Sequence, residues 1–373
     1  MDKLKSILSR LRPAPPLPPP SGKIVRVKDA GGFCEAVSRA VPGSTILLAD
    51  GVYSMPKGVA ISANDVSIRG ENGNRDAVIL DGFEHFMDVD SALLCVKGAQ
   101  RTLIADLTFQ NSKKYGLLLF GDSGAHGLNV YNIVFHNIWA RGLKGTSPYR
   151  RNDSANDLNP PEVVAQVRPR DGQVRHCLFI ADRVKTDLAD GYNGDYISGI
   201  DMQYLTNWTI ADNAFVGIQG AHGWGRGAIF LWVGSEKITI ERNVFFNCDR
   251  SIALGNPSSE YLNVRGAVVR DNEIVAGANR AVECNWTQDV DVYKNVIYAT
   301  RYEYPTVEFI RGSEGCRFHH NIVHGTISCE PSARTEYNQL GNLEGCFTEP
   351  ENGNLDLTEK GKKIFGKWQF KKE

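Results

Sequence analysis

Charged and aromatic side chains recur at one place in a series of short apolar segments, most of which open with glycine. GLKGT (142–146), GIDMQ (199–203) and GAIFLW (227–232) are examples. The alternation of a β-strand would turn Leu143, Ile200 and Ile229 inward and the residues between them outward. The outward positions form two columns: Leu118, Lys144, Asp201, Phe230, Ala253, Glu283 and Glu308, and beside them Phe120, Thr146, Gln203, Trp232, Gly255 and Asn285. The two columns would place ionisable side chains next to aromatic rings on one outer surface.

Two long insertions flank the same columns. Residues 147–172 follow Lys144 and are basic, whereas residues 182–198 precede Asp201 and are acidic. Long loops in a compact repeat are usually functional or disordered, and we favour function because both insertions flank the same pair of residues. Arginines such as Arg168 can hold a carboxylate through two parallel hydrogen bonds, which predicts an acidic polysaccharide as the ligand. The alternative is that the two loops pair with each other as a solvated lid.

The segment AHGWGRGAIFLW (221–232) adds a titratable, a cationic and an aromatic group beside the columns. Tryptophan rings can stack on sugar rings, and a histidine titrates near neutral pH. Columns of charged and aromatic side chains make a shallow groove that suits a linear glycan. The candidate binding residues are Arg168, Arg250, Gln203, Trp224, Phe230, Trp232, Glu283 and Asn285.

The leading hypothesis for the chemistry is β-elimination on a uronic acid, which makes the chain a polysaccharide lyase. Removing the proton next to a carboxylate requires that the carboxylate charge be neutralised first. Arg226, together with Arg168 or Arg250, is the candidate for this neutralisation. The candidates for proton transfer are Lys144 or His222 as the base and Tyr192 as the acid on the leaving oxygen.

Three alternatives stay open. A glycoside hydrolase needs two carboxylates, which Asp201 with Asp190 or Asp195 would supply, with Glu283 and Glu308 farther along the column. An epimerase would release no new chain ends. In a non-catalytic carbohydrate-binding protein, Lys144 and Asp201 would form only a surface ion pair.

A calcium site is a further possibility in the second insertion, where Asp187, Asp190 and Asp195 are candidate ligands. The spacing does not match an EF-hand, and loops rich in Asp, Asn and Gly often form without metal. We therefore favour a protein without a metal or another cofactor.

The elements that must position these residues are repeated strands. A polar residue recurs within a second series of apolar segments, at Asp106, Asn132, His176, Asn213, Asn243, Asn272, Asn295 and Asn321. Stacked coils would place equivalent asparagines about 4.8 Å apart, so their amides can form a ladder. The repeat predicts a single all-β domain, a right-handed parallel β-helix, over residues 23–330.

The two ends of the chain lack the repeat. We expect the Pro-rich residues 1–22 to be disordered and residues 29–41 to form a short helix that covers the first coil. Residues 331–373 are expected to form a C-terminal cap with a basic tail, in which Ile364, Phe365, Trp368 and Phe370 cover the last coil.

Composition limits the classes of partner. The net charge of −1 gives no field for nucleic acid, and no apolar run is long enough to span a membrane. The eight cysteines include no CxxC pair and mostly lie in apolar runs, which is typical of buried thiols. The first residues lack the apolar core and cleavage site of a signal peptide, so the sequence leaves the location of the protein open. We expect a monomer that binds a polysaccharide or an oligosaccharide.

The run FCEAVSRAVPGSTILLADGVYS followed by VSIRGENGNRDAVILDG resembles the opening of the pectate-lyase-like superfamily, especially its alginate lyase and chondroitinase B branch. The coils from GLLLF to HHNIVHG are similar to the carbohydrate-binding and sugar-hydrolase β-helix repeats of bacterial proteins. This resemblance implies the fold, a carbohydrate substrate, and secreted or periplasmic relatives. It does not carry over a catalytic Lys–Arg pair, because Gly234 and Gly255 stand at one pair of matching positions, and at the other Trp286 replaces the lysine while Arg311 is retained.

Overall fold

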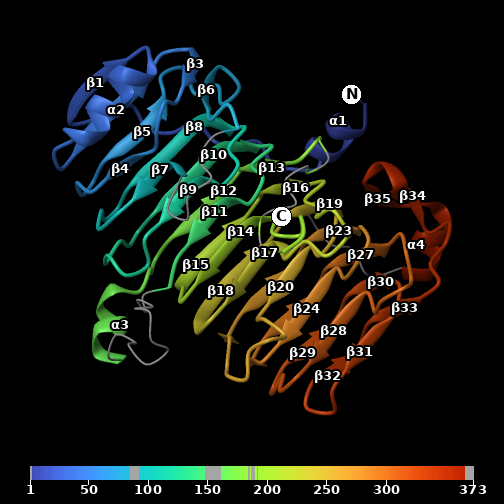
Figure 1. Cartoon of the computed structure of the whole chain (residues 1–373). Coiled ribbons are helices and arrows are strands. Elements are labelled where there is room, and N and C mark those ends of the chain that lie inside the picture. The colour runs from blue at the N-terminus through green and yellow to red at the C-terminus, as the bar shows by residue number, and fades with distance from the viewer. Residues whose placement is uncertain are drawn as a thin grey trace.

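The computed structural model describes residues 2–84, 92–147, 161–183, 185, 190 and 192–365. Within these residues the chain winds into successive coils, and each coil adds one parallel strand to each of three faces. Figure 1 shows the coils stacked along one axis, from the N-terminal strands in blue to the C-terminal strands in red. The strand pairings and the single long core confirm the predicted solenoid.

The first face is the one that positions the candidate site. Its ten strands follow one another in chain order. They are β4 (Val59–Ile61), β7 (Ala92–Val96), β9 (Tyr115–Leu119), β11 (Arg141–Gly145), β14 (Ser198–Gln203), β17 (Gly227–Trp232), β20 (Ile252–Leu254), β24 (Val282–Asn285), β28 (Val307–Ile310) and β31 (Ile327–Cys329).

The second and third faces are joined into one sheet, because two long strands bend across both. These are β8 (Leu103–Gln110) and β10 (Asn129–His136). The second face also contains β1 (Lys23–Val27), β2 (Ser44–Leu48), β5 (Ser67–Gly70), β12 (Gln173–Arg175), β15 (Thr206–Ala211), β18 (Ser235–Glu241), β21 (Val264–Arg265), β22 (Val268–Arg270), β25 (Thr287–Gln288), β26 (Asp291–Tyr293), β29 (Arg317–His319) and β32 (Arg334–Glu336). The third also contains β3 (Gly51–Ser54), β6 (Val78–Asp81), β13 (Leu178–Ile180), β16 (Ala214–Val216), β19 (Val244–Cys248), β23 (Glu273–Ala276), β27 (Val296–Ala299), β30 (Ile322–His324) and β33 (Gln339–Gly341).

The apolar column predicted for the first face is confirmed. Leu143 pairs with Leu117 on one side and with Ile200 on the other, and the register continues through Ile229 and Ile252. All these side chains are fully buried. On the third face, phenylalanine rings from successive coils stack with centroids 4.5–5.4 Å apart: Phe109, Phe135, Phe179, Phe215 and Phe245. Dispersion between these close-packed rings stabilises the register of the coils.

The asparagine ladder is present from Asn213 to Asn321 and gains a further member, Asn338. The side-chain amide of each donates to the amide oxygen of the next at 2.9–3.1 Å. Each also donates to a main-chain carbonyl one coil back, so the buried amides are satisfied.

The first three polar residues of the predicted ladder do not align with the others, although the Asn132 amide donates to Oδ1 of Asp106 at 2.7 Å. Asp106, Asn132 and His176 lie one residue earlier in the turn, at a position with φ of 51–57° that later coils fill with residues such as Asp212 and Arg242. The left-handed conformation is easiest for Asn, Asp and Gly. The residue that aligns with Asn213 is Cys177, whose main-chain N–H donates to the Asn213 oxygen.

Helix α2 (Ala30–Ser38) covers the first coil, as the sequence predicts. The side chain of Asp29 accepts from the N–H of Gly32 and caps the helix, and Phe33 and Val37 are buried against the core. At the other end the coils continue past residue 330 into β32 and β33. The remaining elements are β34 (Phe347–Glu349), η1 (Pro350–Asn352), β35 (Asn354–Leu357) and α4 (Glu359–Phe365).

These last elements pack on the side of the solenoid. Phe347, Leu355 and Phe365 join a separate apolar cluster with Phe246 and Val275 of the third face. Ile364 is half exposed. Trp368 and Phe370, the other residues expected to cover the last coil, lie outside the described residues.

The N-terminal segment, for which the sequence suggested disorder, lies along the outside of the coils. Helix α1 (Asp2–Leu8) buries Ile7 in the C-terminal cluster, and Arg10 ion-pairs with Glu273. Farther along, the carbonyl of Pro18 accepts from Arg69, which belongs to an early coil. Among the described residues, no helix has both the length and the apolar character needed to cross a bilayer.

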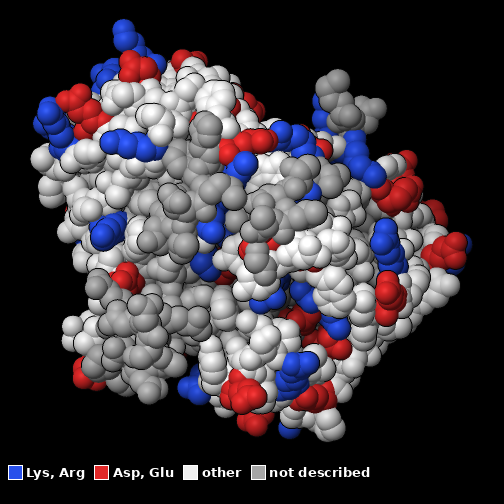
Figure 2. All heavy atoms as spheres, viewed as in Figure 1, with Lys and Arg blue, Asp and Glu red and all other residues white. Residues whose placement is uncertain are grey.

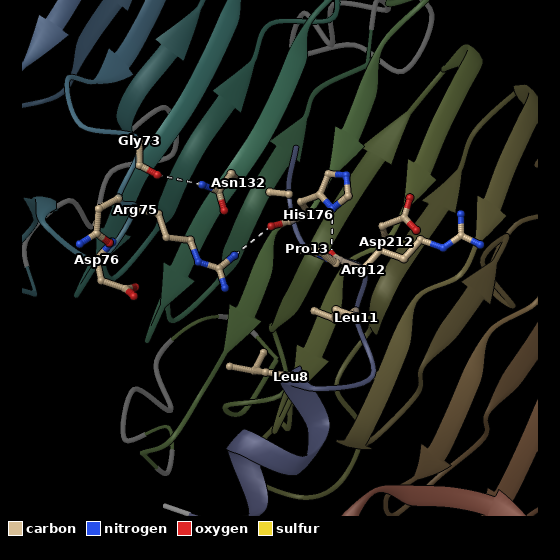
Figure 3. A pocket seen from close by; sticks show the side chains of 12 residues that line it. Leu8, Leu11, Arg12, Pro13, Gly73, Arg75, Asp76, Asn132, His176 and Asp212 are labelled. Carbon is tan, nitrogen blue, oxygen red and sulfur yellow. Dashed lines mark hydrogen bonds between the residues drawn. The ribbon is translucent and has the colours of Figure 1, made fainter. Parts of the chain in front are cut away.

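A hollow of about 450 Å³ remains between this segment and the coils. Figure 3 shows Leu8 and Leu11 on one side of it, while Arg75 and His176 lie on the other. Arg75 donates to the carbonyl of His176 at 2.9 Å, and the His176 ring lies 3.3 Å from the carbonyl oxygen of Arg12. Two of the polar side chains that line this hollow, Arg75 and His176, thus already contact main-chain carbonyl groups of the protein.

Candidate functional site

The strand register confirms the first of the two outward columns predicted for the first face and, in the second column, the pairing of Gln203 with Trp232. Lys144 pairs with Asp201, Asp201 with Phe230, and Gln203 with Trp232. The columns are not an open groove, however. Lys144, Asp201 and Phe230 are each less than a tenth exposed, because residues from the loops between strands lie over them. The exposed part of the site is therefore built from these covering side chains.

Asp201 of β14 is held by three donors. Its Oδ2 accepts from Nε of Arg141 at 2.6 Å, while its Oδ1 lies 3.0 Å from Nζ of Lys144 and accepts from Nε1 of Trp232 at 3.0 Å. Burial alone would raise the pKa of this carboxyl, but the positive charges of Lys144 and Arg141 lower it to about 2. Asp201 is thus ionised and fully engaged.

Tyr196 lies directly over this group. The guanidinium carbon of Arg141 is 3.6 Å from the centre of the Tyr196 ring, and the ring of Tyr192 stacks on that of Tyr196 at 5.0 Å. Burial would raise the pKa of Tyr196, but the charges of Arg141 and Lys144 outweigh it and lower the pKa. The adjacent Tyr115 shows the opposite effect, since burial raises its pKa.

A regular pairing of arginine with carboxylate links successive coils of this face. Each arginine stands two residues before the inward apolar residue of its strand, as Arg141 does before Leu143. Each carboxylate stands one residue after the inward apolar residue of the next strand, as Asp201 does after Ile200. Arg141 thus meets Asp201, Arg250 meets Glu283 at 2.9 Å, and Arg280 meets Glu308. The coil that begins with Ser198 has no arginine at this place, and the next coil accordingly has Phe230 instead of an acid.

Arg226 breaks this pattern. It stands three residues before the inward Ile229, because Gly227, which pairs with Ser198, occupies the arginine position of this strand, and the acid position on the next strand is Ala253. Within the described residues its guanidinium forms neither a hydrogen bond nor an ion pair. The guanidinium carbon lies 5.6 Å from the centre of the Tyr192 ring and 5.4 Å from that of the Phe230 ring. Burial lowers the pKa of Arg226, and the charges of Arg141 and Arg250 lower it further.

Aromatic side chains surround this cation. Tyr192 is 52% and Trp224 is 41% exposed, whereas Phe230 is buried and stacks on Trp232 at 5.2 Å. The guanidinium of Arg250 lies 5.2 Å from the Trp224 ring. Figure 2 shows basic side chains gathered over the middle strands of this face, with acidic side chains among them. An anion with an apolar ring face would meet complementary groups here.

The loop residues that the sequence analysis named are brought close to Arg226. Asp195 accepts main-chain N–H groups of His222 and Trp224 at 3.0 and 3.4 Å, and its other oxygen lies 3.5 Å from Nδ1 of His222. The His222 side chain is half exposed. One loop therefore carries His222, Trp224 and Arg226 across the face.

The possible calcium ligands are used by the protein itself. Asp190 ion-pairs with the buried Lys185 and accepts N–H groups of Tyr192, Gly194 and Tyr196. Burial would raise the pKa of Asp190, but these donors lower it to about 2. Asp187 lies outside the described residues. The described residues do not fit a calcium site, since a lysine already neutralises Asp190 and no group of three His, Cys, Asp or Glu side chains among them could hold a metal ion.

The side chains of the other predicted binding residues mostly bond to other parts of the protein or are buried. Arg168 donates to the carbonyls of Tyr204, Leu205 and Gly234, and so ties the end of α3 (Pro161–Val167) to two turns. Glu283 is bound by Arg250 and by the amide of Asn285, which is itself buried. Gln203 is half-buried at the end of β14.

The sequence analysis missed Arg141, Tyr196 and Arg280. A signal for the arginines was present, because Arg141, Arg226, Arg250 and Arg280 all stand just before the segments of the first face. Their partners could not be assigned without the register. Tyr196 carried no signal, since it lies in an insertion whose path the repeat does not determine.

No family model matches the sequence, and no curated protein matches it significantly. Solved structures do match. An alginate lyase from Paenibacillus sp. str. FPU-7 is 13% identical, with a TM-score of 0.53 over 86% of this chain and 99% of that chain. The pectate lyase Pel9A is 13% identical, with a TM-score of 0.55 over 91% and 90% of the two chains. The chain has the parallel β-helix fold of these structures.

A third similar structure is not described as an enzyme. PfbA, a surface adhesin of Streptococcus pneumoniae, is 14% identical, with a TM-score of 0.57 over 84% of this chain and 88% of that chain. At this level of identity the similarity shows the β-helix fold alone. Function must therefore be argued from the side chains of the site.

Proposed function

We propose that this β-helix binds a uronate-containing polysaccharide and cleaves it by β-elimination. The observation that carries the proposal is Arg226, a cation of this face that has no carboxylate partner among the residues that the structure describes. A carboxylate of the ligand would take the place that Asp201, Glu283 and Glu308 take for the other arginines. The nearby charges of Arg141 and Arg250 favour an anion at this position.

Neutralising a uronate carboxylate is also what elimination requires. Bound to Arg226 in a partly desolvated setting, the carboxylate would lose its power to repel a second negative charge on the neighbouring carbon. The exposed rings of Tyr192 and Trp224 offer apolar surfaces for the sugar rings on either side. An alginate lyase and a pectate lyase on the same fold support this reaction class.

For the proton transfers we favour His222 and Tyr192. His222 would take the proton next to the carboxylate, with Asp195 orienting its ring through Nδ1. As the carbon–carbon double bond forms, the bond to the leaving oxygen breaks, and Tyr192 would protonate that oxygen. Lys144, the other candidate base, is buried with its ammonium group on Asp201, so we assign it an electrostatic role.

Hydrolysis has weaker support. A glycoside hydrolase needs one protonated and one ionised carboxyl group that both reach the substrate. Asp201, Glu283 and Glu308 are buried and bound to arginines. Asp195 accepts two main-chain N–H groups.

The test is a panel of polyuronates incubated with the protein, with detection of unsaturated ends by their ultraviolet absorbance. At least one polymer should be cleaved, and Arg226→Ala should lower kcat/KM about 100-fold, as expected when one charge-stabilising group is lost. Arg265→Ala, at an exposed arginine of the second face, is the control and should leave the rate unchanged. Saturated ends, binding without cleavage, or an unaffected Arg226→Ala variant would each overturn the lyase proposal.

A further inference from the structure

The segment that carries Arg226 is held by two carboxylates from different parts of the chain. We name residues 217–226 the Arg226 loop. Asp249, just before β20, accepts the N–H groups of Gly220 and Gly225 on one oxygen, at 2.8 and 2.9 Å. Asp195, just before β14, accepts those of His222 and Trp224. The two ends of the stretch 220–225 are thus bound to Asp249 and its middle to Asp195, on different coils.

The loop sequence is adapted to this close approach. A Cβ on Gly220 would lie 2.2 Å from Oδ1 of Asp195, and one on Gly225 would lie 3.0 Å from Oδ2 of Asp249. Gly223 adopts a φ of 79°, which a residue with a side chain rarely does. These glycines let the main chain wrap the two carboxylates and turn back toward β17.

Asp249 is an unusual anchor, because it is fully buried and its Oδ1 has no hydrogen-bond partner among the described residues. Burial raises its pKa, although the Gly225 and Gly220 N–H groups act in the opposite direction. A buried carboxylate with an unmet oxygen is unfavourable for the fold. What Asp249 contributes is local: it fixes Gly225, which directly precedes Arg226.

We infer that Asp249 is a positioning residue that holds the Arg226 loop so that the guanidinium of Arg226 faces the carboxylate of the bound saccharide. This inference rests on the proposed function of Arg226. Asp249 itself does not reach the ligand. Without it the Gly220 and Gly225 N–H groups lose their acceptor, and Arg226 is no longer fixed over Phe230 and Tyr192.

The first arm of the test needs no substrate. In Asp249→Ala, amide hydrogen exchange over 217–226 should be at least about tenfold faster than in the wild type, since two charge-assisted hydrogen bonds are lost. Exchange in β22 and β23, on the other two faces, should stay unchanged. Asp249→Asn keeps one oxygen for both N–H groups and should restore slow exchange. Unchanged exchange in Asp249→Ala would overturn the inference whether or not the protein is a lyase.

The second arm is a double-mutant cycle on cleavage, or on oligouronate binding if nothing is cleaved. Asp249→Ala should lower kcat/KM or affinity at least about tenfold, and Asp249→Asn should recover most of it. Adding Asp249→Ala to Arg226→Ala should cause little further loss, because the two residues act as one unit. Additive losses would mean a merely structural role and would overturn the inference. A wild type that neither cleaves nor binds any polyuronate would instead remove the proposed function, and with it the role of the loop in substrate recognition.

Discussion

Arg141 and Asp201 form an ion pair between neighbouring coils in which the side chains are only 1% and 2% exposed. Lys144 shares the same carboxylate at 3.0 Å. A buried ion pair contributes little net stability, because both partners lose hydration. Removing one partner is nevertheless costly, since the other charge is left buried without compensation.

Asp201→Ala should therefore lower the free energy of unfolding by about 3–5 kcal/mol, because Arg141 and Lys144 would both lose their counter-ion. The matched control is Asp65→Ala, which breaks the exposed pair with Arg101 and should have a much smaller effect, because solvent screens that pair. Urea unfolding followed by circular dichroism measures both. Equal effects for the two variants would contradict the account of a buried, doubly bound carboxylate.

The asparagine ladder leads to a second prediction. Asn272→Ala should destabilise the protein by more than about 2 kcal/mol, because the side chain and main-chain N–H of Asn243 lose the oxygen that both donate to. Asn338→Ala should cost less, since Asn338 is only partly buried at the end of the ladder. Thermal unfolding of the two variants distinguishes them. A larger effect at Asn338 would argue against buried amide satisfaction as the cause.

His324 predicts a pH dependence of stability. Its Nδ1 accepts the N–H of Leu343 at 2.8 Å and its ring stacks on Tyr298, so the folded state favours the neutral ring. Burial lowers the pKa of His324 below its usual 6.5, only partly offset by Glu344. As the pH falls through 6.5, the unfolded chain takes up the proton first, so stability is full above that pH and declines below it.

His324→Phe removes this titration and should flatten the decline in melting temperature between about pH 7 and pH 5. The comparison must be with the wild type at each pH, because burial also lowers the pKa of His176 and adds a loss of the same sign. Parallel curves for the two proteins would show that His324 does not contribute.

Lys144→Met should raise the pKa of Tyr196. The positive charge of Lys144 is one of the two that lower this pKa against the effect of burial, and methionine removes the charge while keeping much of the volume. A spectrophotometric titration of tyrosinate measures the change. Tyr196→Phe, recorded in parallel, identifies the transition that belongs to Tyr196, and a transition that does not move would refute the electrostatic coupling.

The coils of the first face could be predicted from the sequence because their pattern is local. Strand side chains alternate with period two, so Leu143, Ile200 and Ile229 could be placed in one column without coordinates. The asparagine ladder was recognisable for the same reason. It failed at His176 because the repeat does not show which residue of a turn aligns with Asn213, and only the hydrogen bonding places Cys177 there.

The site was predicted less completely. Lys144, Asp201, Phe230 and Trp232 were expected together and do lie together, and the exposed Trp224 and Tyr192 border them. Their burial was not expected. It arises from Tyr196 and from Arg141, which cover the columns through contacts between neighbouring coils whose residues are distant in the sequence.

The sequence alone determined the alternation and the order of the coils, because both follow from backbone geometry repeated at a nearly fixed spacing. The tertiary structure decided which arginine forms an ion pair with which carboxylate. Arg226 stands one residue earlier than Arg250 relative to its strand, because Gly227 occupies the arginine position, and the next strand has Ala253 where the other pairs have an acid. Charges interact through distances in space, so a one-residue change in a turn can alter the chemistry of a face without altering its fold.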